Sequence, residues 1–208
     1  MQGVIIMKGQ LNDEAVQVTG SKRWPTLARN FGISFMAAIL TGIIFGLLLR
    51  LVMGIIAYFF PHMASGFSFS GTFIILVVGI AGTLANSIVY TLVFQSSSKS
   101  WVRKGFYYGV VSLIIYGIPL FLSNPNNELF GPQAPLGIGL FSGLFFAGAF
   151  LLAFFIELVT NWIDRSKRRV KLAYVSFAIL VIPAAVILVN IFLEIFYEML
   201  PKIIDNFS

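Results

Sequence analysis

Five long apolar stretches, separated by short polar segments, limit what this chain can fold into. Each has close to the ~20 residues that a helix needs to cross a hydrocarbon core of about 30 Å. Charged residues make up 11% of the chain and the mean hydropathy is +0.92, whereas a soluble domain carries roughly 25% charged residues. We therefore predict one all-α, polytopic transmembrane helix bundle with five spans. The expected spans are residues 31–60, 72–94, 105–122, 136–160 and 172–198.

The basic segment 165–171 indicates the orientation of the bundle, because it carries five cations in seven residues. Positive charge beside a span is retained on the cytoplasmic side of a membrane. This predicts a cytosolic N-terminus and an exterior C-terminus. In that arrangement all but two of the 14 Lys and Arg residues, Arg50 and Lys202, lie on the cytosolic side. The three tryptophans fall at the cytosolic ends of spans, where indole rings prefer the headgroup level. They are Trp24, Trp101 and Trp162.

The segments outside the spans divide the chain into three parts. Residues 1–30 are polar, carry both charge signs and show no sustained period, so we expect a mostly disordered cytosolic tail. Residues 31–198 form the bundle, in which residues 51–60 either continue the first span or lie in the outer interface. A bend is expected at Pro119. Residues 199–208 are amphipathic and contain Pro201, which predicts an outer interfacial segment.

Small residues at helical spacing indicate where the helices pack. Such residues let helix backbones approach closely in lipid, where packing rather than water exclusion holds helices together. They are Gly42 and Gly46 in the first span, Ala81, Gly82 and Ala85 in the second, and Gly139, Gly143 and Ala147 in the fourth.

Motifs for chemistry are missing from the sequence. The chain has no cysteine and one histidine, His62, and it contains no zinc-protease, serine-hydrolase or phosphate-binding pattern. We therefore predict no enzyme activity, no cofactor and no metal site. Ser68, Ser70 and Thr72 are expected to cap the second helix. Glu157 and Asp164 are expected to pair with the basic segment 165–171.

Four polar residues within the spans form a candidate intramembrane cluster: Arg50, Asn86, Asn190 and Glu194. The amide of Asn86 needs a partner inside the bilayer, and an interhelical hydrogen bond is the expected one. Arg50 and Glu194 are expected at similar depth in the outer half of the membrane. They either reach the headgroups independently or pair with each other.

Two neighbouring segments carry a resemblance to known proteins. They are Arg50-Leu51-Val52-Met53-Gly54 and Gly66-Phe67-Ser68-Phe69-Ser70-Gly71-Thr72. Together they resemble a pattern found in uncharacterised families of small bacterial multi-pass membrane proteins. The resemblance implies a bacterial inner-membrane setting and transfers no functional residue.

Two functions fit these features. The first is a non-catalytic integral membrane protein, a subunit or assembly partner of a larger complex, with the small-residue faces as its support. The second is a small transporter or channel that uses the four intramembrane polar residues. Convergence of these residues on one water-filled cavity would favour the transporter. The expected contacts are the lipid bilayer, anionic headgroups at the cytosolic face and a membrane-protein partner, and not nucleic acid.

Overall fold

The computed structural model describes residues 2–61, 68–94, 97, 99–123 and 131–207, with side chains described from Trp24 onward. All regular elements in these ranges are helical. Two of them, η2 and η4, are short π-helical segments within longer helices. The elements are α1 (Gln2–Phe59), α2 (Phe69–Phe94), α3 (Trp101–Ser112), η2 (Leu113–Gly117), α4 (Ile118–Ser123), α5 (Ala134–Asp164), α6 (Lys167–Glu194), η4 (Ile195–Met199) and α7 (Leu200–Phe207).

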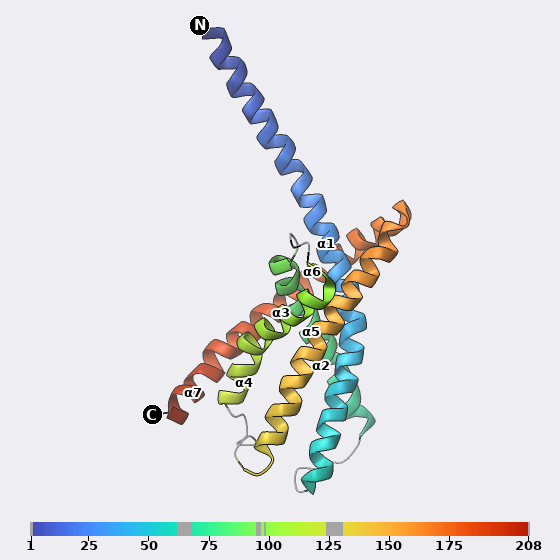
Figure 1. The fold of residues 1–208 in the computed structure, drawn as a ribbon, viewed down its shortest axis with the longest axis vertical. Coiled ribbons are helices and arrows are strands. Elements are labelled where there is room, and N and C mark those ends of the chain that lie inside the picture. The colour runs from blue at the N-terminus through green and yellow to red at the C-terminus, as the bar shows by residue number, and fades with distance from the viewer. Residues whose placement is uncertain (1, 62–67, 95–96, 98, 124–130, 208) are drawn as a thin grey trace.

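The predicted all-α bundle with five spans is confirmed. Five helices are long and apolar enough to cross a membrane, and they run alternately up and down the bundle (Figure 1). Residues 51–59 continue the first span as part of α1. The spans are Trp24–Phe59, Phe69–Phe94, Trp101–Ser123, Ala134–Asp164 and Lys167–Asn206.

The backbone of the N-terminal segment differs from the expectation. Residues 2–30 belong to helix α1, whereas a mostly disordered tail was expected. Extending a helix that already exists avoids the cost of nucleation, so a moderately helix-favouring sequence can join the first span. Pro25 lies inside α1, and the N-terminal part of the helix reaches well beyond the rest of the bundle (Figure 1).

Each π-helical segment ends two residues before a proline. The Ile118 N–H donates to the Leu113 carbonyl, and the Leu200 N–H donates to the Ile195 carbonyl, both five residues back. A proline ring clashes with the carbonyl four residues earlier and lacks an N–H, and a wider turn relieves that clash. The predicted distortion at Pro119 is thus a π-helical turn, and Pro201 follows a second one.

The last segment continues the fifth span. Residues 200–207 form α7, which packs against α4. The Asn206 Nδ2 donates a hydrogen bond to the Leu122 carbonyl at 3.2 Å. The end of the fifth span therefore lies beside the end of the third, although an interfacial location for 199–208 stays a prediction.

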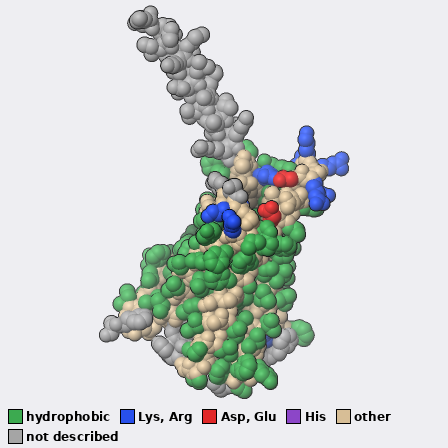
Figure 2. All heavy atoms as spheres, in the orientation of Figure 1, with side chains coloured by type: hydrophobic (Ala, Val, Ile, Leu, Met, Phe, Trp, Pro, Cys, Tyr) green, Lys and Arg blue, Asp and Glu red, His purple; other side chains and the backbone are tan. Residues whose placement is uncertain are grey.

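Most of the described positive charge gathers at one end of the bundle, and apolar side chains cover most of the visible surface elsewhere (Figure 2). We call this the basic end; it comprises Arg29, residues 99–104 and residues 165–171. Asp164 forms an ion pair there with Arg29 of α1. The expected pairing of Asp164 with segment 165–171 is corrected accordingly, because the antiparallel helices bring α1 beside the end of α5. The Arg169 guanidinium instead lies over the Trp162 ring, 4.6 Å from its centroid.

The predicted small-residue contact is confirmed for α1. A Cβ on Gly42 would lie 2.5 Å from the Ile80 Cα, and one on Gly46 would lie 2.9 Å from the Leu76 Cα. The facing glycine on α2 is Gly79, whereas a Cβ on Gly82 would meet nothing within 4 Å. The helix backbones therefore touch at this crossing.

Other small residues pack differently from the expectation. A Cβ on Gly139 or Gly143 of α5 would meet nothing within 4 Å. Instead, Gly148 lies against the Phe45 ring, where a Cβ would come within 2.9 Å. On α3, Gly105 and Gly109 face phenylalanine side chains of α5. This i, i+4 glycine pair was visible in the sequence but was not singled out.

The start of α2 is capped as expected. The Gly71 N–H donates to the Ser68 Oγ at 3.0 Å, and the Thr72 Oγ1 donates to the Ser68 carbonyl at 3.0 Å. Because the first N–H groups of a helix have no partner within it, this bond stabilises the end of α2 opposite the basic end.

Candidate functional site

A cavity of about 270 Å³ lies at the centre of the bundle. All five spans contribute to its wall. By this measure a single water needs only about 10–15 Å³, so the cavity can hold a larger molecule. Its lining residues are Phe45, Leu49, Val78, Gly82, Thr83, Asn86, Tyr108, Ser112, Tyr116, Leu120, Phe141, Leu144, Phe145, Gly148, Ala149, Leu152 and Ile191.

One wall of this central cavity is polar. The Tyr108 hydroxyl of α3 lies 2.7 Å from both the Asn86 Oδ1 and the Asn86 carbonyl oxygen of α2. The hydroxyl has one hydrogen, which these two acceptors share. The Asn86 Nδ2 donates to the Gly82 carbonyl at 3.1 Å. The expected interhelical hydrogen bond of Asn86 is therefore confirmed, with Tyr108 as its partner.

Tyr116 lines the same wall from η2. Its hydroxyl oxygen is buried and has no hydrogen-bond partner among the described residues. Tyr116 was not among the residues predicted from the sequence. The one available signal was Pro119 three positions later, since a proline in a span perturbs the helix register just before it.

A layer of three aromatic rings separates the central cavity from the basic end. The Tyr108 ring makes edge-on contacts with Tyr90, at 5.1 Å between centroids, and with Phe94, at 6.3 Å. Tyr108 lines the central cavity, whereas Tyr90 and Phe94 line a second pocket closer to the basic end. The three rings therefore lie between the central cavity and the second pocket.

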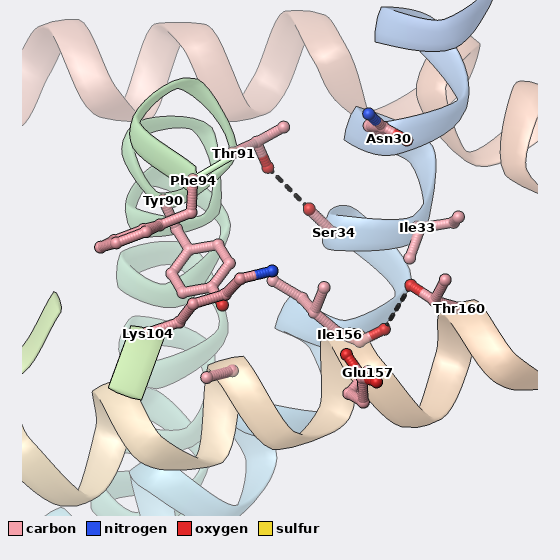
Figure 3. Close-up of a pocket in the computed structure, with 11 residues that line it drawn as sticks. Asn30, Ile33, Ser34, Tyr90, Thr91, Phe94, Lys104, Ile156, Glu157 and Thr160 are labelled. Atoms are coloured by element: carbon pink, nitrogen blue, oxygen red, sulfur yellow. Dashed lines mark hydrogen bonds between the residues drawn. The ribbon is translucent and has the colours of Figure 1, made fainter. Parts of the chain in front are cut away.

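The second pocket, of about 130 Å³, is polar. Figure 3 shows the Lys104 amine of α3 extending into it and the Glu157 carboxylate of α5 pointing toward it. The Thr91 hydroxyl lies 2.6 Å from the Ser34 Oγ across the α1–α2 contact. Glu157, which was expected to pair with segment 165–171, instead lines this pocket. The pocket offers hydrogen-bond donors and acceptors together with one cation and one carboxylate.

The four polar residues of the expected cluster are distributed over the molecule. Asn86 lines the central cavity, whereas Arg50 and Asn190 do not, although their neighbours Leu49 and Ile191 do. Arg50 is half-buried, and Asn190 and Glu194 are exposed on α6. A pairing of Arg50 with Glu194 stays a prediction. Because the four do not converge on the cavity, the argument for a transporter loses its original basis.

The residues that the structure describes form no metal-binding site. No three side chains of His, Cys, Asp and Glu in these ranges lie close enough to hold an ion. His62 lies outside the described residues.

Comparison of the chain with protein-family models, curated proteins and solved structures finds no match. The architecture by itself defines the class. The chain is a multi-pass membrane protein whose five candidate membrane-spanning helices contact the lipid bilayer.

Proposed function

We propose that this protein is a non-catalytic subunit or assembly partner of a membrane complex, and that another membrane protein covers the exposed face of α6. The observation that carries the proposal is a row of polar side chains on the outside of the fifth span. Asn190, Glu194 and Glu198 follow one another at intervals of four residues, and all three are exposed.

The contact between Asn206 and Leu122 near the end of the chain allows the depth of this polar row in the membrane to be inferred. The Asn206 side chain bonds to the end of α4, after which the sequence turns polar. Glu194 precedes Asn206 by about 18 Å of helix at 1.5 Å per residue. From this length of helix we infer that Glu194 and Asn190 lie inside the apolar part of the bundle rather than at its edge.

Ionisable groups at such depth almost always face protein or a water-filled cavity, because exposure to hydrocarbon is costly. The fifth span is also the least covered by the rest of the chain. In its most apolar window 11% of the residues are buried, against 28% in each of the other four spans.

The exposed apolar residues of α6 have the spacing of a helix-pairing seam. They alternate at intervals of three and four residues, the pattern by which two helices pack with a small left-handed crossing angle. Asn190 and Glu194 lie directly beside this seam. The seam comprises Leu172, Val175, Ile179, Ile182, Val186, Val189 and Leu193.

Charge argues that the partner is a different protein. A second copy in the same orientation would place its own carboxylates beside Glu194. Apart from Arg50 and Lys202, the described cations of this chain lie at the basic end (Figure 2). The partner helix is therefore expected to carry a Lys, Arg or His at the depth of Glu194.

This interface can be tested by Glu194→Leu. The wild-type chain, purified in mild detergent, should retain a stoichiometric membrane protein, and Glu194→Leu should lower its recovery about tenfold, as expected for loss of a charge-assisted hydrogen bond. Ile114→Ala, which alters an exposed residue of η2, is the control and should leave recovery unchanged. A cysteine at Leu193 should crosslink to the same protein.

Three results would contradict the proposal. A clean monomer from native membranes would argue against any partner. Equal recovery with Glu194→Leu would remove the polar row from the interface. A crosslinked homodimer through Leu193→Cys would replace the proposed partner with a second copy.

We also infer that the basic end faces the cytosol of a bacterial cell and contacts anionic headgroups of its inner membrane. The gathering of cations at one end supports this orientation. Trp101, at the start of α3, and Trp162, near the end of α5, both belong to the basic end of the bundle. The resemblance around Arg50 supports the bacterial setting. This is the orientation predicted from residues 165–171.

Cysteine labelling tests the orientation, since the chain has no native cysteine. An impermeant maleimide applied to intact cells should label Ser70→Cys, which is exposed at the start of α2. It should label Ser100→Cys and Ser166→Cys only after the membrane is permeabilised. The reverse pattern would invert the arrangement of every span.

A further inference from the structure

The polar pocket near the basic end is lined by two opposite charges that do not pair with each other. The Lys104 amine extends into the pocket and the Glu157 carboxylate points toward it (Figure 3). Among the residues that the structure describes, neither of these two groups forms an ion pair or a hydrogen bond. Lys104 is half-buried, and a charge that is partly withdrawn from water is costly unless it is paired. The two charges therefore favour a ligand that enters the pocket.

Most other polar groups of this pocket are already bonded within the protein. The Thr91 hydroxyl bonds to the Ser34 Oγ, and the Thr160 Oγ1 donates to the Ile156 carbonyl at 2.6 Å. The two charges and the Asn30 amide are left to hold a ligand. A simple anion would be repelled by the carboxylate, and a simple cation by the amine. The pocket, of about 130 Å³, therefore suits a small group that carries both an anionic oxygen and an ammonium.

Aromatic residues beside the pocket indicate its depth in the membrane. Trp101 of α3 makes an edge-on contact with Phe154 of α5, with 5.5 Å between ring centroids, and indole rings prefer the headgroup level. Glu157 follows Phe154 by one turn of α5, about 5 Å of helix toward the basic end. Phe154 and Leu158, on either side of Glu157 in the sequence, are exposed, so acyl chains can lie against them. A lipid is therefore favoured over a water-soluble molecule with the same charged groups.

We propose that the polar pocket binds the headgroup of an aminophospholipid, with the phosphate against Lys104 and the primary ammonium against Glu157. A primary ammonium can donate three hydrogens, whereas the trimethylammonium of phosphatidylcholine carries none. Phosphatidylglycerol has the phosphate but no cation for Glu157. The site thus differs from the general attraction of the basic end for anionic headgroups. It depends neither on the partner of α6 nor on the orientation of the chain.

Native mass spectrometry of the purified full chain in detergent tests this site. Phosphatidylethanolamine, phosphatidylcholine and phosphatidylglycerol with the same acyl chains are titrated separately, and free phosphoethanolamine is the water-soluble arm. The wild type should bind one phosphatidylethanolamine about tenfold more tightly than either of the other two lipids, as expected for one charge-assisted hydrogen bond. Free phosphoethanolamine at the same concentrations should leave the chain unoccupied.

Two variants and one control locate the binding in the pocket. Glu157→Gln keeps the size of the side chain and removes its charge, so it should abolish the preference for phosphatidylethanolamine over phosphatidylcholine. Lys104→Gln removes the phosphate contact and should lower the affinity for phosphatidylethanolamine about tenfold. Arg103→Gln is the matched control, because Arg103 is an exposed cation next to Lys104 that does not line the pocket. It should leave the preference unchanged.

Four results would overturn the proposal. Equal affinity of the wild type for phosphatidylethanolamine and phosphatidylcholine would remove the ammonium contact. A preference that survives Glu157→Gln would mean that the lipid binds elsewhere on the chain. An equal loss of the preference in Arg103→Gln and Lys104→Gln would attribute it to the overall charge of the basic end. Binding of free phosphoethanolamine without any preference among the lipids would assign the pocket to a water-soluble ligand.

Discussion

Replacing Gly79 with alanine is expected to prevent most of the chain from folding. The added Cβ would lie 2.7 Å from the Gly42 carbonyl oxygen and 2.9 Å from the Gly46 Cα. Both atoms are backbone, so no side chain can rotate away and the two helices must separate. Overpacking of this kind costs about 1–3 kcal/mol, and more where backbones must move.

Gly82→Ala is the matched control on the same helix. Its Cβ would meet nothing within 4 Å, so the change should alter stability by no more than about 1 kcal/mol, in the direction of helix propensity. The measurement is the folded fraction by size-exclusion chromatography, with the thermal midpoint of each purified variant. Equal losses for both variants would show that α1 and α2 do not touch at Gly79.

Tyr108→Ala should cause the second large loss of stability. Tyr108 is 2% exposed and joins α2, α3 and the aromatic layer. Truncating a large buried aromatic side chain costs about 3–5 kcal/mol, because a void replaces its contacts. The same change would open the central cavity toward the polar pocket. The fraction of the variant that still folds should therefore bind a larger amount of a water-soluble probe than the wild type does.

Tyr108→Phe separates the hydroxyl from the ring. It keeps the packing and removes the bond to Asn86, a loss of roughly 0.6–2 kcal/mol for polar contacts between membrane helices. Tyr107→Ala, at a position 47% exposed, should be nearly silent. Thermal unfolding in one detergent compares all three variants; a Tyr108→Phe loss as large as that of Tyr108→Ala would assign the stability to the hydroxyl.

The cavity depends on tertiary structure more than on any local pattern. Asn86 could be identified from the sequence, because an amide within an apolar stretch is unusual and needs a partner. Its partner Tyr108 could not, since nothing in the spacing of the second and third spans shows which faces meet. The register of Tyr116 depends on the π-helical turn before Pro119.

The glycines show the same difference between what the sequence predicts and what tertiary structure decides. Small residues at intervals of four predict that a helix can be approached closely, and Gly42 and Gly46 are indeed approached. The same spacing at Gly139 and Gly143 leads to no close contact with any residue that the structure describes. A small residue permits an approach, but only the position of the neighbouring helix decides whether one occurs.

The number of spans and the asymmetry of charge follow from the sequence alone, because the bilayer imposes a length on every apolar helix and charged residues avoid its interior. The partners of Asp164 and Asn86 and the cavity among five helices depend on tertiary structure. These features arise from contacts between residues far apart in the chain, such as Asn206 with Leu122. Local periodicity carries no information about such contacts, since it describes one helix at a time.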